Sequence, residues 1–130
     1  MKPKILVIDD SADSWALLNA VLQSHGYAPV WAADGMQAMG VARTHQPQVI
    51  LLDLGLPGGD GFLILERLKA NKFLSHVPVI VITARAPKEG EEKALKLGAV
   101  SYVQKPINVD ELIAGLQQLL APAKKRSSIG

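Results

Sequence analysis

The chain has 130 residues, of which 48% are hydrophobic, and it contains no cysteine. This length fits one domain, and the apolar fraction is large enough for a core, which excludes a disordered chain. The lack of cysteine excludes disulfides, thiolate metal sites and a thiol nucleophile, and it is compatible with a reducing cytoplasm. The first apolar run is four residues long, which is too short for a signal peptide or a membrane span.

The net charge of +2 comes from 14 basic and 12 acidic residues. Three of the basic residues, Lys124, Lys125 and Arg126, lie close together near the C-terminus, and without them 11 basic residues stand against 12 acidic ones. The rest of the chain therefore carries a net charge of −1. This balance predicts that the domain does not bind nucleic acid directly.

Five apolar runs predict β-strands, and stretches of helical length separate them. The strands are expected at 5–8, 28–32, 49–52, 79–82 and 100–103, and the helices at 12–25, 35–45, 60–71, 88–97 and 109–120. The first, third and fourth runs are continuous and rich in β-branched residues, which is typical of strands buried on both faces of a parallel sheet. Pro29 lacks an amide donor and favours a sheet edge for the second strand.

The alternation of strands and helices predicts an α/β fold. Right-handed crossovers between parallel strands place helices on both faces of one doubly wound sheet. Asp34 before Gln37, and Asn108 before Glu111, resemble helix capping pairs. Pro122 stops the last helix, so we expect one domain at 1–121 and a flexible basic tail, or the start of a linker, at 122–130.

Polar side chains follow four of the five predicted strands. Asp9 and Asp10 come after the first, Asp53 after the third, Thr83 after the fourth, and Lys105 shortly after the fifth. Ligands of open parallel sheets bind outside the carboxyl ends of the strands, so these side chains are expected to meet there. Three crowded carboxylates repel one another unless a divalent cation and an ammonium neutralise them. An oxygen-rich site without sulfur suits Mg²⁺ or Mn²⁺.

Each of these residues also has an ordinary explanation when it is taken alone. The two consecutive aspartates could cap the first helix, and Asp53 could begin a loop. Thr83 could be a β-former that ends its strand, and Lys105 could be a solvated surface lysine. Their joint occurrence at strand ends favours a site. Within it, a carboxylate can take up a phosphoryl group as an aspartyl phosphate, while a lysine offsets charge on the phosphoryl oxygens.

Two further features concern the backbone near this edge. The segment after Asp53 carries one proline and four glycines in eight residues, which lets the backbone approach an ion or a phosphate. X-Pro bonds are cis in about 5–6% of cases in folded proteins, and a cis bond between Lys105 and Pro106 would turn Lys105 back toward the site.

Taken as a set, these motifs resemble the receiver domain of two-component response regulators, including stand-alone chemotaxis-type regulators. The resemblance covers roughly 3–121 and rests on the first Asp-Asp pair, the pattern Asp-x-x-x-Pro-x-x-Asp-Gly at 53–61, Thr83-Ala84 and Lys105-Pro106. It implies a flavodoxin-like (βα)5 fold with strand order 2-1-3-4-5. It also implies that Asp53 accepts phosphate from a phosphohistidine of a histidine kinase or phosphotransfer protein.

The same resemblance implies roles for the other site residues. Asp9 and Asp10 would hold Mg²⁺ together with Asp53 and the backbone carbonyl of Gly55, and Lys105 would pair with Asp53 or its phosphoryl group. Gly55 and Arg85 occupy positions that affect the lifetime of the phosphoryl group in this family.

A switch is also implied, in which Thr83 is drawn to the phosphoryl group and Tyr102 turns inward. This change would alter the surface of the fourth helix, fifth strand and fifth helix, which an output partner reads, or a second copy in a phosphorylation-dependent homodimer. The ordinary explanation of Tyr102 is a half-buried strand aromatic with its hydroxyl in water.

We interpret the chain as a cytoplasmic phospho-accepting switch that catalyses only its own phosphorylation and dephosphorylation, not as an enzyme that turns over a metabolite. One alternative is a docking module of the same fold that works without phosphorylation. Another is a flavodoxin-like enzyme or cofactor binder, but no Gly-x-Gly-x-x-Gly segment or Walker lysine loop follows the first strand.

Overall fold

The computed structural model describes residues 2–55, 61–84 and 88–120. Within them the strands are β1 (Lys4–Ile8), β2 (Ala28–Ala32), β3 (Val49–Asp53), β4 (Val79–Thr83) and β5 (Ser101–Gln104). The helices are α1 (Ala12–Ser24), α2 (Gly35–His45), α3 (Gly61–Ala70), α4 (Lys88–Lys96) and α5 (Val109–Leu119). Arg85, residues 56–60 and the predicted tail at 122–130 lie outside the described residues, as does the predicted domain boundary at 121.

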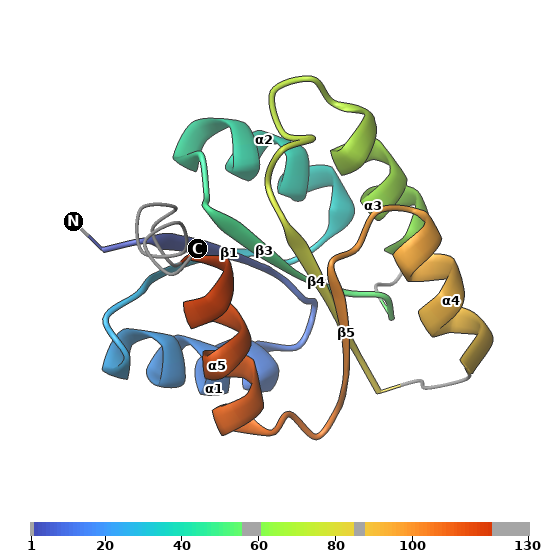
Figure 1. Cartoon of the computed structure of the whole chain (residues 1–130). Helices are drawn as coiled ribbons and strands as arrows, with labels where there is room; N and C mark the ends of the chain where they lie inside the picture. The colour runs from blue at the N-terminus through green and yellow to red at the C-terminus, as the bar shows by residue number, and fades with distance from the viewer. Residues whose placement is uncertain (1, 56–60, 85–87, 121–130) are drawn as a thin grey trace, which may run out of the picture.

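The strands form one sheet in the order β2-β1-β3-β4-β5, and all neighbouring pairs are parallel (Figure 1). This is the flavodoxin-like (βα)5 architecture that the sequence predicted. Strand β1 is the point where the order of strands changes direction: the chain places β2 on one side of β1 and then β3 on the other side. In open α/β sheets the ligand crevice forms at such a switch point, at the carboxyl ends of the strands.

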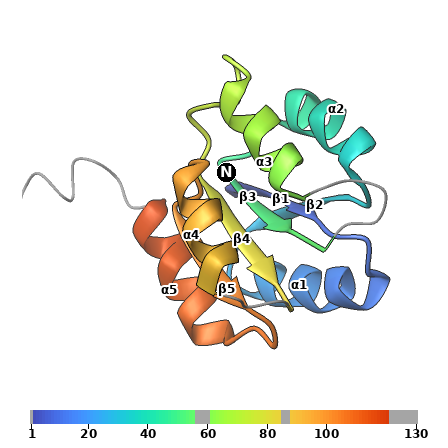
Figure 2. The same ribbon diagram turned by 90° about the vertical axis from the view of Figure 1, so that its right-hand side faces the viewer.

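Helices cover both faces of the sheet, with α1 and α5 on one side and α2 and α3 on the other (Figure 2). Successive residues of a strand point to opposite faces, so Leu6 and Ile8 join one core while Ile5 and Val7 join the other. These four side chains are at most 1% exposed. Burial of each contributes about 1.5–3 kcal/mol, which explains why the strand sequences do not alternate with polar residues.

Helix boundaries follow from side-chain caps. Asp34 accepts a hydrogen bond from the Gln37 amide at 2.9 Å, and Asn108 accepts one from the Glu111 amide at 3.1 Å, which confirms both predicted caps. The cap of α1 is Ser11, which is neither of the two aspartates before it. Neither Asp9 nor Asp10 therefore acts as the N-cap of α1, which was the ordinary explanation of this pair.

Two strand boundaries differ from the sequence prediction in a way that matters for the site. Asp53 and Thr83 are the last residues of β3 and β4, opposite Ile82 and Gln104, so their backbones are fixed by the sheet. Strand β5 begins at Ser101, one residue later than expected, and Val100 before it is 47% exposed. None of the described helices is long and apolar enough to cross a membrane.

Candidate functional site

Three carboxylates converge at the carboxyl edge of the sheet. Asp9 and Asp10 follow β1, and Asp53 ends the neighbouring strand β3. One oxygen from each carboxylate lies within 4.8 Å of the others. Residues 44 positions apart in the chain meet here because β1 and β3 are paired in register, with Ile8 opposite Leu52.

Backbone amides orient the two buried carboxylates of this cluster. Asp9 is 2% exposed, and its Oδ1 accepts a hydrogen bond from the Ser11 amide at 2.8 Å. Asp53 is 9% exposed, and its Oδ1 accepts one from the Gly55 amide at 2.8 Å. The second oxygen of each carboxylate faces Lys105. Both side chains are therefore held in one orientation before any ligand binds.

Lys105 joins the two buried carboxylates. Its Nζ donates to Asp9 Oδ2 at 3.0 Å, to Asp53 Oδ2 at 3.2 Å and to Ser14 Oγ at 3.2 Å. Burial acts to lower the pKa of Lys105, but the hydrogen bond to Asp9 and the charges of Asp53 and Asp9 outweigh it, so the pKa is raised above its ordinary value. The ammonium is therefore fully charged at neutral pH. The peptide bond between Lys105 and Pro106 is cis.

Asp10 differs from the other two acids because its side chain is exposed. It makes no hydrogen bond or ion pair with any residue that the structure describes. Its carboxylate is therefore available to an external ligand, and its place is set by the backbone on either side of it.

Two further predicted site residues, Thr83 and Tyr102, lie on β4 and β5. Thr83 is 1% exposed at the end of β4, one residue beyond the partner of Asp53. Tyr102 lies in β5 opposite Val81 and packs, partly buried, against the core that includes Ala94 of α4. Burial, and to a smaller extent the charge of Glu91, raises the pKa of the Tyr102 hydroxyl, so it stays protonated at neutral pH. Tyr102 thus lies in β5 close enough to α4 for the charge of Glu91 to act on its hydroxyl.

Glycines bring the backbone close to Asp53. A Cβ at Gly55 would lie 3.3 Å from Asp53 Oδ1, which is a tight contact. A Cβ at Gly61 would lie 2.5 Å from the Cα of Leu54, which has little freedom to move. Leu54, the first residue after β3, therefore lies against the start of α3 only because residue 61 has no side chain. Arg85, the other residue with a predicted effect on phosphoryl lifetime, is outside the described part of the chain.

Several residues of the site were missed by the sequence reasoning. Ser11 caps α1 and orients Asp9, and serine just before a predicted helix is a recognisable cap signal. Ser14 contacts Lys105, and Trp31 donates a hydrogen bond to the Asp9 carbonyl. No sequence signal points to Ser14 or Trp31, because both contacts depend on how distant elements pack.

Charged residues outside the cluster are distributed unevenly around the fold. All five helices run opposite to the strands, so their first turns lie at the carboxyl edge of the sheet. Acidic residues occupy first turns or caps there: Asp13, Asp34, Asp110 and Glu111. Basic residues occupy last turns at the opposite edge: Arg43, His45, Arg67, Lys69, Lys93 and Lys96. The charge pattern suits the helix dipoles and makes the acidic cluster attractive to cations.

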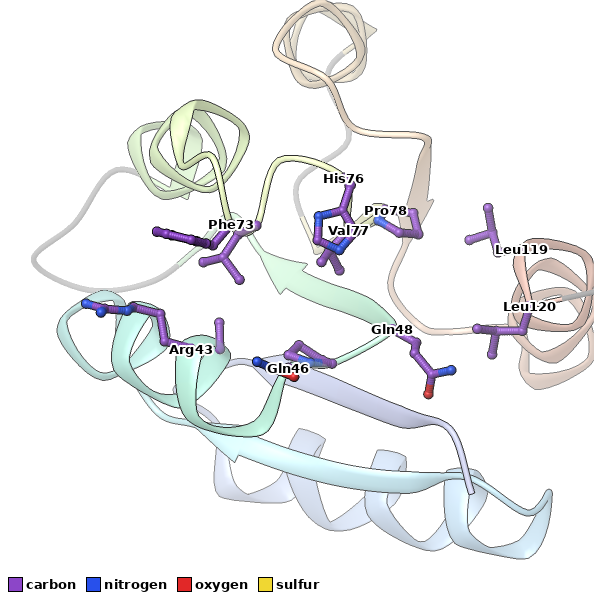
Figure 3. Close-up of a pocket in the computed structure, with 12 residues that line it drawn as sticks. Arg43, Gln46, Gln48, Phe73, His76, Val77, Pro78, Leu119 and Leu120 are labelled. Atoms are coloured by element: carbon purple, nitrogen blue, oxygen red, sulfur yellow. The ribbon is translucent and has the colours of Figure 1, made fainter. Parts of the chain in front are cut away.

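A pocket of about 790 Å³ lies at the amino edge of the sheet, away from the acidic cluster (Figure 3). Arg43, Gln48, Phe73, His76 and Leu120 are among the residues that line it. It shares no residue with the cluster. The candidate site is instead an edge that carries three carboxylates and one ammonium, which suits an ion and a small phosphoryl group.

The side chains of the cluster fit a hard divalent cation. All three candidate ligands are carboxylates, and one of them, that of Asp10, is exposed and has no partner among the residues that the structure describes. Mg²⁺ is bound in proteins through one or two carboxylates with several waters retained, and a partly open oxygen site meets that requirement. Mn²⁺ accepts the same ligands.

Comparison with known proteins shows the family of this chain. Residues 5–117 match the family model of the response regulator receiver domain. The polar-differentiation response regulator DivK of Brucella ovis is 32% identical over 123 residues, which cover 95% of this chain and all of DivK.

Solved structures agree as well. The chemotaxis protein CheY4 of Vibrio cholerae is 28% identical with a TM-score of 0.86, and the match covers 92% of this chain and all of that one. The receiver domain of the sensor histidine kinase PA1611 of Pseudomonas aeruginosa was solved with a magnesium ion coordinated in the active-site cleft. It is 31% identical with a TM-score of 0.84, over 94% of this chain and all of that one. The chain belongs to the response regulator receiver-domain family of two-component signal transduction.

Proposed function

We propose that Asp53 is the phosphoacceptor of a Mg²⁺-dependent switch, supplied by a histidine kinase or phosphotransfer protein. The observation that carries this proposal is the position of Lys105, whose ammonium bridges the Asp9 and Asp53 carboxylates at 3.0 and 3.2 Å. A cation that already pairs with the acceptor carboxylate is placed to pair with a phosphoryl group on it.

In the proposed reaction an Asp53 carboxylate oxygen forms a bond to phosphorus while the P–N bond of the donor phosphohistidine breaks. The imidazole nitrogen keeps the electron pair of that bond. Asp9, Asp10, Asp53 and the Gly55 carbonyl would hold Mg²⁺, which offsets negative charge on the phosphoryl oxygens when bound. Lys105 supplies a second positive charge, and the Thr83 hydroxyl donates to a phosphoryl oxygen. Water later attacks phosphorus, releases inorganic phosphate and restores the carboxylate.

The output of the switch is assigned to the surface of α4, β5 and α5. Thr83 ends β4, which pairs with β5, and Tyr102 of β5 packs against the core that includes Ala94 of α4, so we expect a shift at Thr83 to reach this surface through β5. Exposed apolar residues on it, Leu95 at 45% and Val100 at 47%, suit a protein partner or a second copy of the domain. We place this signalling in the cytoplasm, whose reducing conditions suit a chain without cysteine.

The acceptor is tested with a small phosphodonor. Wild-type protein incubated with MgCl₂ and acetyl phosphate should gain the mass of one phosphoryl group, and hydroxylamine should remove it because acyl phosphates are labile. Asp53→Asn should gain nothing. The matched control is Asp34→Asn, because asparagine caps a helix as well as aspartate does. Phosphorylation of Asp53→Asn would refute the acceptor assignment.

A second experiment separates the proposal from a docking module that needs no phosphorylation. Wild-type protein with Mg²⁺ and beryllofluoride, a phosphoryl mimic, should change its amide NMR spectrum at α4, β5 and α5. A spectrum that stays unchanged would favour the docking module.

A further inference from the structure

The side chain of Trp31 holds the turn that carries two of the acids. Its indole Nε1 donates a 2.7 Å hydrogen bond to the backbone carbonyl of Asp9, across 22 positions of the chain. Trp31 lies in the edge strand β2, and its ring stacks on that of Trp15 in α1, with centroids 5.5 Å apart and planes 6° apart. The stack fixes the indole plane, so its N–H is aimed at the carbonyl.

The peptide groups on both sides of Asp9 are thereby bound to the end of β2. The Asp9 amide donates to the Ala32 carbonyl at 3.1 Å, and the Asp9 carbonyl accepts from Trp31. That carbonyl belongs to the peptide bond that leads into Asp10. The Asp10 side chain has no partner among the described residues, so the orientation of this peptide bond sets where its carboxylate lies.

We propose that Trp31 is a positioning residue for the cation site: its indole N–H fixes the Asp9–Asp10 peptide so that the exposed Asp10 carboxylate faces Asp9 and Asp53. The inference rests on the proposed Mg²⁺ site and adds a residue outside the motif set to it. Without the N–H, the carbonyl would be satisfied by water and the turn would be free to rotate its acids apart, since like charges repel. Removal of an outer-shell residue that orients a metal ligand typically weakens metal affinity about 10- to 100-fold.

The variant Trp31→Phe removes the N–H and keeps an aromatic ring against Trp15. Calorimetric titration with MgCl₂ should give a dissociation constant roughly tenfold higher than that of wild type, at the low end of the outer-shell range. The matched control, Trp15→Phe, keeps the Trp31 N–H and should stay within about twofold of wild type. A purely structural role would instead lower the urea midpoint of Trp31→Phe and leave its Mg²⁺ affinity unchanged.

The outcomes separate this inference from the function on which it rests. Wild-type affinity in a folded Trp31→Phe variant would overturn the role of Trp31 and leave the Mg²⁺ site standing. Failure of the wild-type protein to bind Mg²⁺ would overturn both.

A measurement on the wild-type fold needs no Trp31 variant. In ¹⁵N-labelled protein the two indole N–H signals are assigned from the Trp15→Phe spectrum, which retains that of Trp31. The Trp31 signal should exchange with water more slowly than the Trp15 signal, and it should shift as MgCl₂ is added. A Trp31 signal that stays fixed at saturating Mg²⁺ would contradict the coupling.

Discussion

The Nζ of Lys105 lies 3.2 Å from the Oδ2 of Asp53, although 52 positions separate the two residues in the chain. They meet because β3 and β5 flank β4 in a parallel sheet, and both residues lie at its carboxyl edge. The ammonium neutralises part of a three-carboxylate cluster. A cation that binds the cluster therefore enters a site that already holds one positive charge. We expect the Lys105 ammonium and the cation to compete for the carboxylates, so that the cation affinity depends on Lys105.

Lys105→Ala should still bind Mg²⁺ and should bind it more tightly than wild type, because a positive charge that faces two of the proposed ligands is removed. In the absence of Mg²⁺ the variant should unfold more easily, by on the order of 1–3 kcal/mol. That value lies between those of exposed and fully buried ion pairs because the Lys105 side chain is 20% exposed. Calorimetry and urea denaturation measure the two effects. Weaker Mg²⁺ binding by Lys105→Ala would contradict the competition, and a normal response to beryllofluoride would contradict the proposed signalling role.

The stability that Lys105 contributes should depend on pH in the alkaline range. Its pKa is raised in the folded state, so the contribution is fully present below the ordinary lysine pKa and is lost as the pH rises through the higher folded value. The difference in unfolding free energy between wild type and Lys105→Ala should be constant from about pH 7 to about pH 9 and should shrink above about pH 10.5. Urea titrations of both proteins across this range measure it. A difference that shrinks already near neutral pH would mean that another group is titrating.

Asp10→Ala should weaken Mg²⁺ binding with little effect on folding. The Asp10 side chain is exposed and has no partner among the described residues, so its removal costs the fold nothing specific, while the cation loses a ligand. We expect at least a tenfold rise in the dissociation constant for Mg²⁺, by analogy with the loss of supporting groups around metals. Asp13→Ala, which removes an exposed acid of the first turn of α1, is the matched control. A wild-type titration curve for Asp10→Ala would show that another residue carries the ion.

The sequence predicted the fold and most of the site for a physical reason. Strands that are buried on both faces are continuous apolar runs in the sequence. The functional residues at the carboxyl edge of a parallel sheet come directly after those runs, so the strands and the site residues can both be recognised from short stretches of sequence. Asp9, Asp53 and Lys105 were found in this way. The difference between buried Asp9 and exposed Asp10, and the contact of Trp31 with the Asp9 carbonyl, leave no such signal. They arise from the packing of β2 and α1 around the end of β1.

The acidic first turns around the site should make Mg²⁺ binding sensitive to monovalent salt. Raising KCl from about 0.1 M to about 1 M shortens the Debye length from about 10 Å to about 3 Å, which screens the charges of Asp34 and Asp110. We expect the dissociation constant for Mg²⁺ to rise roughly three- to tenfold over this range. The double variant Asp34→Asn, Asp110→Asn should show a shallower dependence. An identical dependence in both proteins would mean that only the three cluster carboxylates attract the ion.

Gly61→Ala tests the close approach between Leu54, next to Asp53, and the start of α3. An added Cβ would lie 2.5 Å from the Cα of Leu54 and 2.7 Å from its carbonyl oxygen, so the backbone next to Asp53 must move. We expect a loss of about 1–3 kcal/mol in stability, as for overpacked interiors, together with slower phosphorylation by acetyl phosphate. Gly115→Ala is the matched control, because its Cβ would meet nothing within 4 Å inside α5. That change should stabilise the helix by about 0.5–1 kcal/mol and leave phosphorylation unchanged. Equal stability and equal phosphorylation rates in the two variants would show that the backbone at Leu54 relaxes around the methyl group, and the close approach at residue 61 would then have no bearing on Asp53.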